Sequence, residues 1–355
     1  MPCYKPLTAY KSLMEKTDNG KSVIIFNEIE AKQKPCEKVT LPCGQCIGCR
    51  LARSRDWAIR CVHESSLYSD NCFITLTFND ENLNKNGSLV KSDFQKFMKR
   101  LRKKYNGKDS ITNDKGQTIY PIRFFHCGEY GSMLERPHHH ACLFNFDFDD
   151  KELIKVRDGV NLYRSEKLEQ LWSKKIDPYD YLDYKPETLW ENRNGDLMVK
   201  LGYCTLGDVT FESAAYCARY ITKKINGVYA LEHYLKSWNE DTGEAVILEP
   251  EYITMSRRPG IGRGWYEHYN SDLYPKDYVT NLGKKFKVPK YYDNLYEKFS
   301  PDDYLSIKSK RKLAFDVHSD NNTSERLAVR EYCQQRKLNE LYRSYENAET
   351  DVFNL

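Results

Sequence analysis

Residues 136–144 limit the possible structure and chemistry of this chain more than any other segment. They read Arg-Pro-His-His-His-Ala-Cys-Leu-Phe, and the apolar end of the run is typical of a buried β-strand. Because strand side chains alternate between two faces, His138 and His140 point to one face and His139 to the other. Two imidazoles on one face are half of a metal site. The segment therefore predicts a strand that carries a metal centre on one face of a sheet.

The preceding segment supplies a third candidate ligand. Residues 121–127 are expected to form a strand and residues 128–131, Gly-Glu-Tyr-Gly, a turn. If this strand pairs with the histidine strand as a hairpin, Glu129 comes to lie beside His138 and His140. Two imidazoles and one carboxylate suit Mg²⁺ or Mn²⁺ and leave positions open for phosphate oxygens and water. The alternatives are a surface histidine cluster or a structural zinc site.

A second group of chemically active residues follows in residues 216–224, Tyr-Cys-Ala-Arg-Tyr-Ile-Thr-Lys-Lys. Tyr216 and Tyr220 are four residues apart and share one face of a predicted helix, which Thr210 caps and which has Glu212 in its first turn. Lys223 and Lys224 border that face and could lower the pKa of a phenol, ordinarily near 10. The expected apolar stripe lies opposite the tyrosines and comprises Phe211, Ala215, Ala218, Thr222 and Ile225.

Together the two groups predict metal-assisted attack of a tyrosine on a phosphodiester. The plainer alternative for the second group is a pair of exposed tyrosines on an ordinary helix.

Three cysteines in residues 43–49, Cys-Gly-Gln-Cys-Ile-Gly-Cys, have overlapping C-x₂-C spacings. Such spacing can surround one tetrahedral metal ion, and the small residues between ease the turn. Cys3 or Cys36 could supply a fourth ligand. Zinc is the first choice of metal and an iron–sulfur cluster the second, with a structural role in either case. The alternative is a set of free buried cysteines in a reducing cell.

The length, charge and hydrophobicity of the chain restrict its function and location less narrowly than these motifs do. The chain has 355 residues and a net charge of +4, so its overall charge does not demand a nucleic-acid partner. Two local basic patches do suit phosphate backbones: residues 96–104, and Lys284, Lys285, Lys287 and Lys290. No apolar run approaches the roughly 20 residues that span a bilayer, and the start lacks a signal-peptide core. The chain is expected to stay in a reducing cytoplasm, without a membrane partner.

Three regions are expected along the chain: 1–65, rich in clustered cysteines; 66–235, the core; and 236–355, ending in a charged helix. The elements predicted besides those above are helices over 51–66, 92–105 (capped by Ser92), 164–174 and 324–347, and strands over 71–78, 138–146, 201–209 and 251–256. This mixture indicates an α+β fold, with one antiparallel sheet and helices over a face.

The histidine and tyrosine segments resemble the two motifs of the HUH endonucleases, in the two-tyrosine branch that starts rolling-circle replication. Further segments resemble the replication initiation proteins of gokushoviruses, which are phages with circular single-stranded DNA. These segments are residues 1–10, 41–50, 207–213 and 256–265, so the resemblance extends well beyond the two motifs. The middle position of the histidine motif, usually a bulky hydrophobe or tyrosine, is His139 here.

The resemblance implies an HUH-type antiparallel sheet with helices packed on it, a Cys-rich N-terminal segment and a helical C-terminal region. It implies catalytic Tyr216 and Tyr220, assisted by Lys223 and Lys224, with Mg²⁺ or Mn²⁺ held by three ligands, His138, His140 and Glu129. It favours Cys3 as the fourth cysteine ligand, because Met-Pro-Cys-Tyr is a family-like opening.

The implied reaction nicks the replication origin, links one tyrosine to the 5′ phosphate and later religates the released strand. The implied partners are single-stranded and origin DNA and a host helicase and polymerase, in the host bacterial cytoplasm. The sequence has no G-x-x-x-x-G-K-[ST] motif of a built-in helicase motor. The rival functions are a non-catalytic, zinc-stabilised nucleic-acid-binding protein and a related HUH transposase or relaxase.

Overall fold

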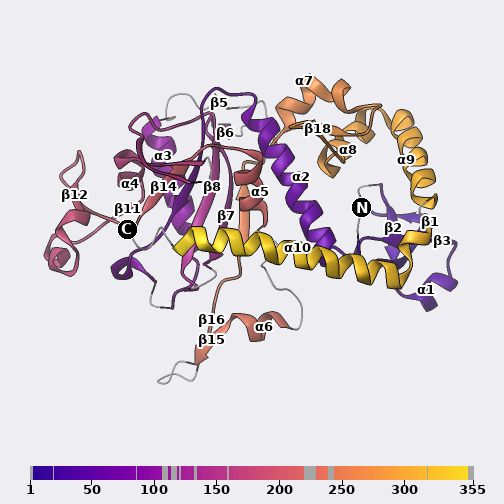
Figure 1. Ribbon diagram of the computed structural model, residues 1–355, viewed down its shortest axis with the longest axis horizontal. Helices are drawn as coiled ribbons and strands as arrows, with labels where there is room; N and C mark the ends of the chain where they lie inside the picture. The colour runs from indigo at the N-terminus through magenta and orange to yellow at the C-terminus, as the bar shows by residue number, and fades with distance from the viewer. Residues whose placement is uncertain are drawn as a thin grey trace. The chain divides into compact units, whose positions relative to one another are not determined.

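A computed structural model gives the fold (Figure 1). It describes residues 3–18, 20–84, 86–105, 111–112, 118–119, 121–131, 134–157, 160–219, 229–238, 244–317 and 319–350. The chain divides into two compact units. The first comprises residues 1–53 and 304–355, and the second comprises residues 54–303.

The centre of the second unit is a seven-stranded antiparallel sheet in the order β17-β7-β8-β4-β14-β10-β9. Its strands are β4 (Asn71–Leu76), β7 (Arg123–Tyr130), β8 (Pro137–Phe144), β9 (Glu152–Arg157), β10 (Val160–Arg164), β14 (Cys204–Gly207) and β17 (Tyr252–Met255). The predicted α+β fold with an antiparallel sheet is confirmed. The sheet takes β17 from beyond residue 236, so it extends outside the predicted core region.

Helices cover both faces of this sheet, and not one face as the sequence suggested. On one face, α3 (Lys91–Tyr105) and α4 (Glu166–Leu171) bury their apolar sides against alternate residues of β4 and β8, including Ile74 and Leu143. On the other face, α5 (Phe211–Arg219) and the second half of α2 (Ile47–Ser65) pack on Phe125 and Cys142. The strand alternation thus supplies an apolar set to each face.

The other elements of the second unit are short or lie beyond the sheet. They are β5 (Ile111–Thr112), β6 (Thr118–Ile119), β11 (Ser173–Lys175), β12 (Leu189–Glu191), β13 (Leu197–Lys200), α6 (Tyr229–Tyr234), β15 (Leu235–Trp238), β16 (Ala245–Ile247), α7 (Arg263–Leu273), β18 (Val279–Asn281), β19 (Lys284–Phe286), α8 (Lys290–Phe299) and the 3₁₀ turns Asp80–Asn82, Pro178–Asp183 and Pro186–Thr188. Helix α9 (Pro301–Asp316) crosses into the first unit.

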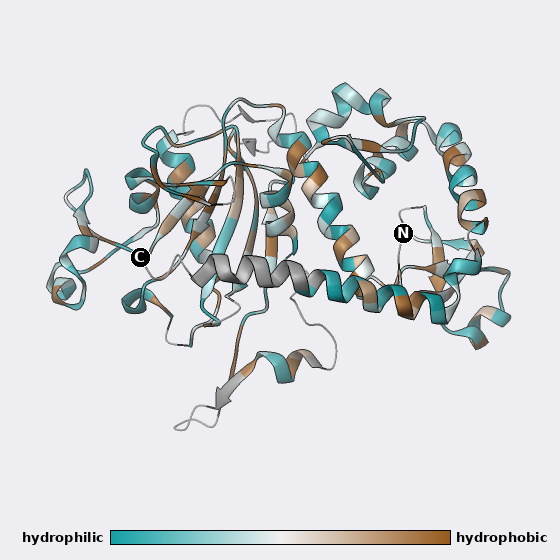
Figure 2. Cartoon of the chain, in the orientation of Figure 1, coloured by the Kyte–Doolittle hydropathy of each residue, from teal (hydrophilic) through white to brown (hydrophobic). Residues whose placement is uncertain are grey.

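The first unit contains a three-stranded sheet, β2-β1-β3, and the cysteine cluster. Its elements are β1 (Leu7–Lys16), β2 (Ser22–Ile25), α1 (Glu28–Lys32), β3 (Cys36–Leu41), the start of α2, the end of α9, the 3₁₀ turn Ser319–Asn322 and α10 (Ser324–Thr350). Helix α2 alternates hydrophobic and hydrophilic stretches along its length (Figure 2), as expected for a helix with one buried side. The predicted charged helix at 324–347 is confirmed as α10.

Several predicted boundaries were wrong. Residues 128–130 continue strand β7, where the sequence suggested a turn. Only glycine fits at position 128 without a steric clash, because a Cβ there would lie 2.8 Å from a ring carbon of Tyr252 on the neighbouring strand. Helix α3 begins at Lys91, so Ser92 lies inside it and does not cap it. Helix α4 spans only Glu166–Leu171, and the Ser165 side chain accepts a hydrogen bond from Leu168 N to cap it.

The other shifts are smaller and leave each element in place. Strands β4, β8, β14 and β17 are shorter than the predicted ranges, and α2 begins at Ile47, four residues earlier than predicted. No helix in the described part of the chain has the length and apolar character needed to cross a membrane.

Candidate active site

The centre of the site is built by the pairing of β7 with β8. Their antiparallel register sets Glu129 opposite His138 and Cys127 opposite His140. Directly paired residues lie on the same face of a sheet, so Glu129, His138 and His140 converge on one face. This arrangement is the one that the sequence predicted. It needs no loop, because two neighbouring strands supply all three side chains.

Each imidazole approaches the same carboxylate oxygen. Nε2 of His138 and Nε2 of His140 both lie 2.8 Å from Oε1 of Glu129. All three side chains are buried, Glu129 completely. Burial alone would raise the pKa of the Glu129 carboxyl, but the two imidazoles outweigh burial and lower the pKa. The carboxylate is therefore held in its charged form.

A second contact orients each histidine ring. Nδ1 of His138 donates to the carbonyl oxygen of Arg136 at 3.0 Å, since a carbonyl can only accept. Nδ1 of His140 lies 2.9 Å from the Thr75 hydroxyl on β4. These contacts leave Nε2 of both rings for the centre of the site. Thr75 was not predicted as a site residue, because only the register of β4 against β8 brings it beside His140.

The donor set fits a divalent cation. With the proton on Nδ1, a neutral His138 presents its Nε2 lone pair to a carboxylate oxygen 2.8 Å away. That contact is favourable only if a positive charge lies there, either a proton or a metal ion bound by both atoms. The ligand atoms of the three residues all lie within 4.8 Å of one another. Three donors from one face leave further coordination positions for other ligands.

His139 occupies the opposite face, as predicted, and takes no part in this site. Its Nδ1 lies 3.2 Å from Nε2 of His126, and the His126 ring stacks on Phe94 of α3 at 3.5 Å. Burial lowers the pKa of His139 to about 3, so the ring is neutral in the folded protein. The pair forms part of the packing between the sheet and α3.

Helix α5 places Tyr216 against the histidine centre. The Tyr216 ring meets His140 edge to face, with 5.1 Å between centroids, and Phe73 at 6.4 Å. The Arg219 guanidinium carbon lies 5.8 Å from the centre of the Tyr216 ring, on the next turn of the helix. The helix begins as predicted, since Ser213 N donates to the Thr210 hydroxyl at 3.1 Å. Tyr220, Lys223 and Lys224 lie outside the described residues.

The buried stripe of α5 differs from the predicted one. Its most buried residues are Ala214, Cys217 and Ala218, while Phe211 and Ala215 are only partly buried. The thiol of Cys217 lies 3.4 Å from that of Cys127 on β7. This side chain is small enough to bring the helix backbone close to the sheet, and Tyr216 is then half-buried beside His140. Thr222 and Ile225, the rest of the predicted stripe, lie outside the described residues.

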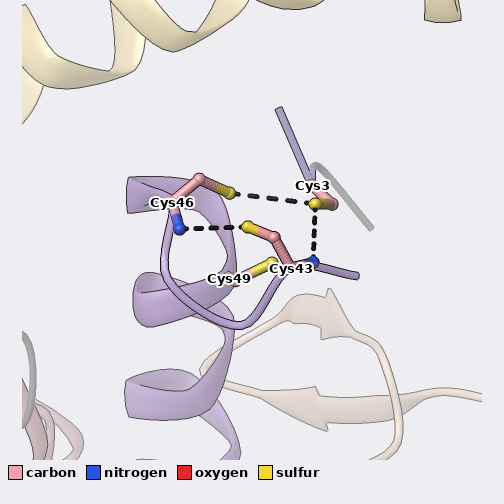
Figure 3. Close-up of side chains that lie close together, drawn as sticks. All are labelled: Cys3, Cys43, Cys46 and Cys49. Carbon is pink, nitrogen blue, oxygen red and sulfur yellow. Dashed lines mark hydrogen bonds between the residues drawn. The ribbon is translucent and has the colours of Figure 1, made fainter. Parts of the chain in front are cut away.

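The predicted cysteine ligands meet in the first unit. The four sulfur atoms of Cys3, Cys43, Cys46 and Cys49 lie within 4.8 Å of one another, and they point toward a common centre (Figure 3). A tetrahedral zinc ion with bonds of about 2.3 Å needs sulfurs about 3.8 Å apart. The Cys3 and Cys46 sulfurs are 3.9 Å apart. Cys36, the alternative fourth ligand, lies in β3 outside this group.

Burial raises the pKa of the Cys3 and Cys49 thiols, whereas backbone N–H groups dominate at Cys46. Cys43 N donates to the Cys3 sulfur and Cys46 N to the Cys43 sulfur, both at 3.2 Å. Burial would raise the pKa of Cys46, but the N–H groups of Cys49 and Tyr4 outweigh it and lower the pKa to about 7. This cluster of donors and thiols fits zinc and lies in a different unit of the chain from the histidine centre.

Comparison with known proteins points to one class. Residues 71–225 match the family model of the replication-associated protein ORF2/G2P. The chain is 32% identical to the replication-associated protein VP4 of Bdellovibrio phage phiMH2K over 88% of this chain and 82% of the relative. It is also 32% identical to the replication-associated protein ORF2 of Spiroplasma virus 4, over 77% and 73% of the two chains. A more distant relative, ORF4 of Chlamydia phage 1, is 25% identical over 79% of this chain and 60% of that protein.

The α+β fold and these relatives define a phage replication-associated protein. The chain belongs to the replication initiators of the gokushovirus type, as the sequence motifs had indicated. No solved structure matches the chain.

Proposed function

We propose that this replication initiator nicks its DNA origin by attack of a tyrosine on a phosphodiester. The observation that carries the proposal is the edge-to-face contact of Tyr216 with His140, one of three converging metal-ligand candidates. A nucleophile beside an open metal site is an arrangement that can carry out phosphoryl transfer. Tyr220, Lys223 and Lys224, which follow Tyr216 in the sequence, are proposed to act with it.

Each residue has a proposed role. His138, His140 and Glu129 hold a divalent cation, Mg²⁺ or Mn²⁺, which neutralises and polarises the scissile phosphate when bound. The Tyr216 oxygen attacks phosphorus and loses its proton, while the bond to the 3′ oxygen breaks and that oxygen gains a proton. The 5′ phosphate remains on the tyrosine. Arg219, with its guanidinium carbon 5.8 Å from the centre of the Tyr216 ring, adds a positive charge that favours loss of the phenol proton.

The bond energy of the broken ester is kept in the phosphotyrosine, so religation needs no ATP. Tyr220 is the proposed second nucleophile, which cuts the regenerated origin so that the released strand can be closed into a circle. The free 3′ hydroxyl then serves as a primer for a host polymerase, with a host helicase to unwind the duplex. This activity belongs in the host bacterial cytoplasm, on single-stranded and origin DNA.

A zinc ion on Cys3, Cys43, Cys46 and Cys49 has a proposed structural role. Four thiols would close its coordination sphere and leave no position for substrate. The histidine centre has three donors and is therefore the better candidate for catalysis.

Cleavage of labelled single-stranded oligonucleotides that tile the phage genome tests the proposal. With Mn²⁺ the wild-type protein should cut at one site, and the His138→Ala/His140→Ala variant should not. His268→Ala, which changes an exposed histidine, is the matched control and should cut normally. Full cleavage by the double variant, with its fold verified by circular dichroism, would overturn the metal assignment.

A further inference from the structure

The β18–β19 hairpin and the residue that follows it carry three lysines, whose side chains alternate between the two faces of the chain. Lys284, Lys285 and Lys287 are exposed, and no carboxylate among the described residues lies within ion-pair distance of them. The two-residue turn at Leu282 and Gly283 has positive φ at both positions, which matches the twist of a tight hairpin. The Lys285 ammonium lies 4.3 Å from the centre of the Tyr278 ring, while Lys284 and Lys287 project from an ordered backbone, where they can meet the phosphates of a nucleic acid.

A pocket opens at the base of the same hairpin. It has a volume of about 280 Å³ and is lined by residues of α7 and β18 and by His63 of α2. Trp265 and Tyr278 provide aromatic walls, and Asp272 and Lys276 provide an acceptor and a cation. This volume is at the low end for ligand sites and suits a group the size of one nucleobase.

Contacts with neighbouring side chains fix the Trp265 wall of the pocket. The His63 ring stacks on Trp265 at 3.5 Å between centroids, and its Nδ1 lies 3.0 Å from the Tyr292 hydroxyl. That bond leaves Nε2 as the ring nitrogen available to a ligand. A rigid aromatic wall loses little entropy when a flat ligand stacks on it.

The β18–β19 hairpin also packs against α5, the helix that carries Tyr216. Phe286, the last residue of β19, stacks on Phe211, the first residue of α5, with 5.4 Å between centroids. The guanidinium carbon of Arg55 on α2 lies 6.0 Å from the centre of the Phe286 ring. A strand bound along the hairpin is thereby held close to the start of the helix that carries Tyr216.

We propose that the β18–β19 hairpin and the pocket at its base bind single-stranded DNA outside the metal centre. Lys284, Lys285 and Lys287 contact phosphates of the strand, and one unstacked base enters between Trp265 and Tyr278. A single strand is favoured over a duplex because paired bases are stacked and cannot enter the pocket. The site would hold the strand while the tyrosine chemistry takes place elsewhere on the same face of the sheet.

The first test measures the salt dependence of binding to a labelled single strand, by fluorescence anisotropy without added divalent metal. Binding in this assay does not depend on whether Tyr216 cuts DNA, so failure of the proposed nicking would not affect the result. Replacement of Lys284, Lys285 and Lys287 with alanine should weaken binding and reduce the slope of log K against log salt by about 2. The control removes three exposed lysines from β1 and β3 of the first unit, Lys11, Lys16 and Lys38, which lie outside both basic patches, and should keep the wild-type slope. Equal slopes for the two triple variants would overturn the proposal.

The second test probes the base pocket. An oligonucleotide that contains 5-iododeoxyuridine should cross-link under ultraviolet light to Trp265 or Tyr278, as mapped by mass spectrometry. Tyr278→Ala should weaken single-strand binding about 5- to 150-fold, while Tyr278→Phe keeps the stacking surface and should bind normally. Cross-links only to other residues, or a duplex that binds as tightly and is equally sensitive to Tyr278→Ala, would contradict the proposal.

Discussion

Replacement of Arg123 with methionine should destabilise the second unit strongly. Arg123, at the start of β7, is 5% exposed, and Glu64 on α2 is 2% exposed. The guanidinium forms an ion pair with Glu64 and also donates to the carbonyl oxygen of Pro259 at 2.8 Å. The second carboxylate oxygen of Glu64 accepts from Gly262 N at 2.6 Å. One buried pair thus joins the sheet, α2 and the segment that leads into α7.

The expected loss of folding free energy follows from the Glu64 charge that remains buried without a partner. Removal of one partner from a buried ion pair costs about 3–5 kcal/mol, because Glu64 becomes an uncompensated buried charge. Such a loss should lower the midpoint of thermal unfolding by about 6–20 °C. The variant Arg123→Met/Glu64→Gln removes both charges, and its amide oxygen still accepts from Gly262 N. It should therefore be more stable than Arg123→Met by about 2 kcal/mol or more.

Urea unfolding followed by circular dichroism measures these differences, with the slope of each transition as a check on comparability. Arg193→Met is the matched control, since Arg193 is exposed, and it should change stability by less than about 0.5 kcal/mol. The reasoning is refuted if Arg123→Met costs less than about 1 kcal/mol, or if the effects of Arg123→Met and Glu64→Gln simply add in the double variant.

Three further predictions concern other parts of the chain. Metal analysis of protein purified without added zinc should find about one tightly bound ion, which Cys46→Ser should lose; equal metal content in both would contradict the four-sulfur site. Gly262→Ala should cost about 2 kcal/mol or more in the free energy of unfolding, because φ is 78° and a Cβ would lie 2.3 Å from the Tyr292 hydroxyl; wild-type stability in urea would argue against this packing. Burial lowers the pKa of His63 to about 3 from an ordinary 6.5, so the unfolded chain binds the proton more tightly and stability is lost as the pH falls from about 6.5 towards 3. Between pH 7 and pH 5 the contribution of His63 to this loss is about 2 kcal/mol, so His63→Gln should lose less stability than the wild type by about that amount; equal losses would contradict the burial of a neutral ring.

The sequence predicted the histidine centre well because strand geometry leaves little freedom. Alternation fixes the faces of His138, His139 and His140, and a hairpin of adjacent strands brings Glu129 opposite. The cysteine cluster was predicted for a similar reason, since C-x₂-C spacing is a local property of the chain. The choice of Cys3 over Cys36 came from the resemblance to a family and not from spacing.

Features that depend on distant contacts were not predictable in this way. Gly128 begins the segment Gly-Glu-Tyr-Gly, which is typical of a turn. The ring of Tyr252 on another strand makes glycine necessary at this position within β7. The buried stripe of α5 rotates toward Cys217 because that thiol packs on Cys127. Thr75 orients His140 only through the pairing of β4 with β8. In each case the deciding partner is far away in the sequence, and propensity or periodicity contains no information about it.

Mapping the covalent protein–DNA adduct tests the central claim most directly. Wild-type protein, Mn²⁺ and the oligonucleotide that it cuts are incubated, separated on a denaturing gel and digested, and the DNA-bearing peptide is identified by mass spectrometry. We expect DNA on Tyr216 or Tyr220, partial cleavage by each single Tyr→Phe variant, and no adduct from the double variant. An adduct on any other residue, or one still formed when both hydroxyls are absent, would contradict it.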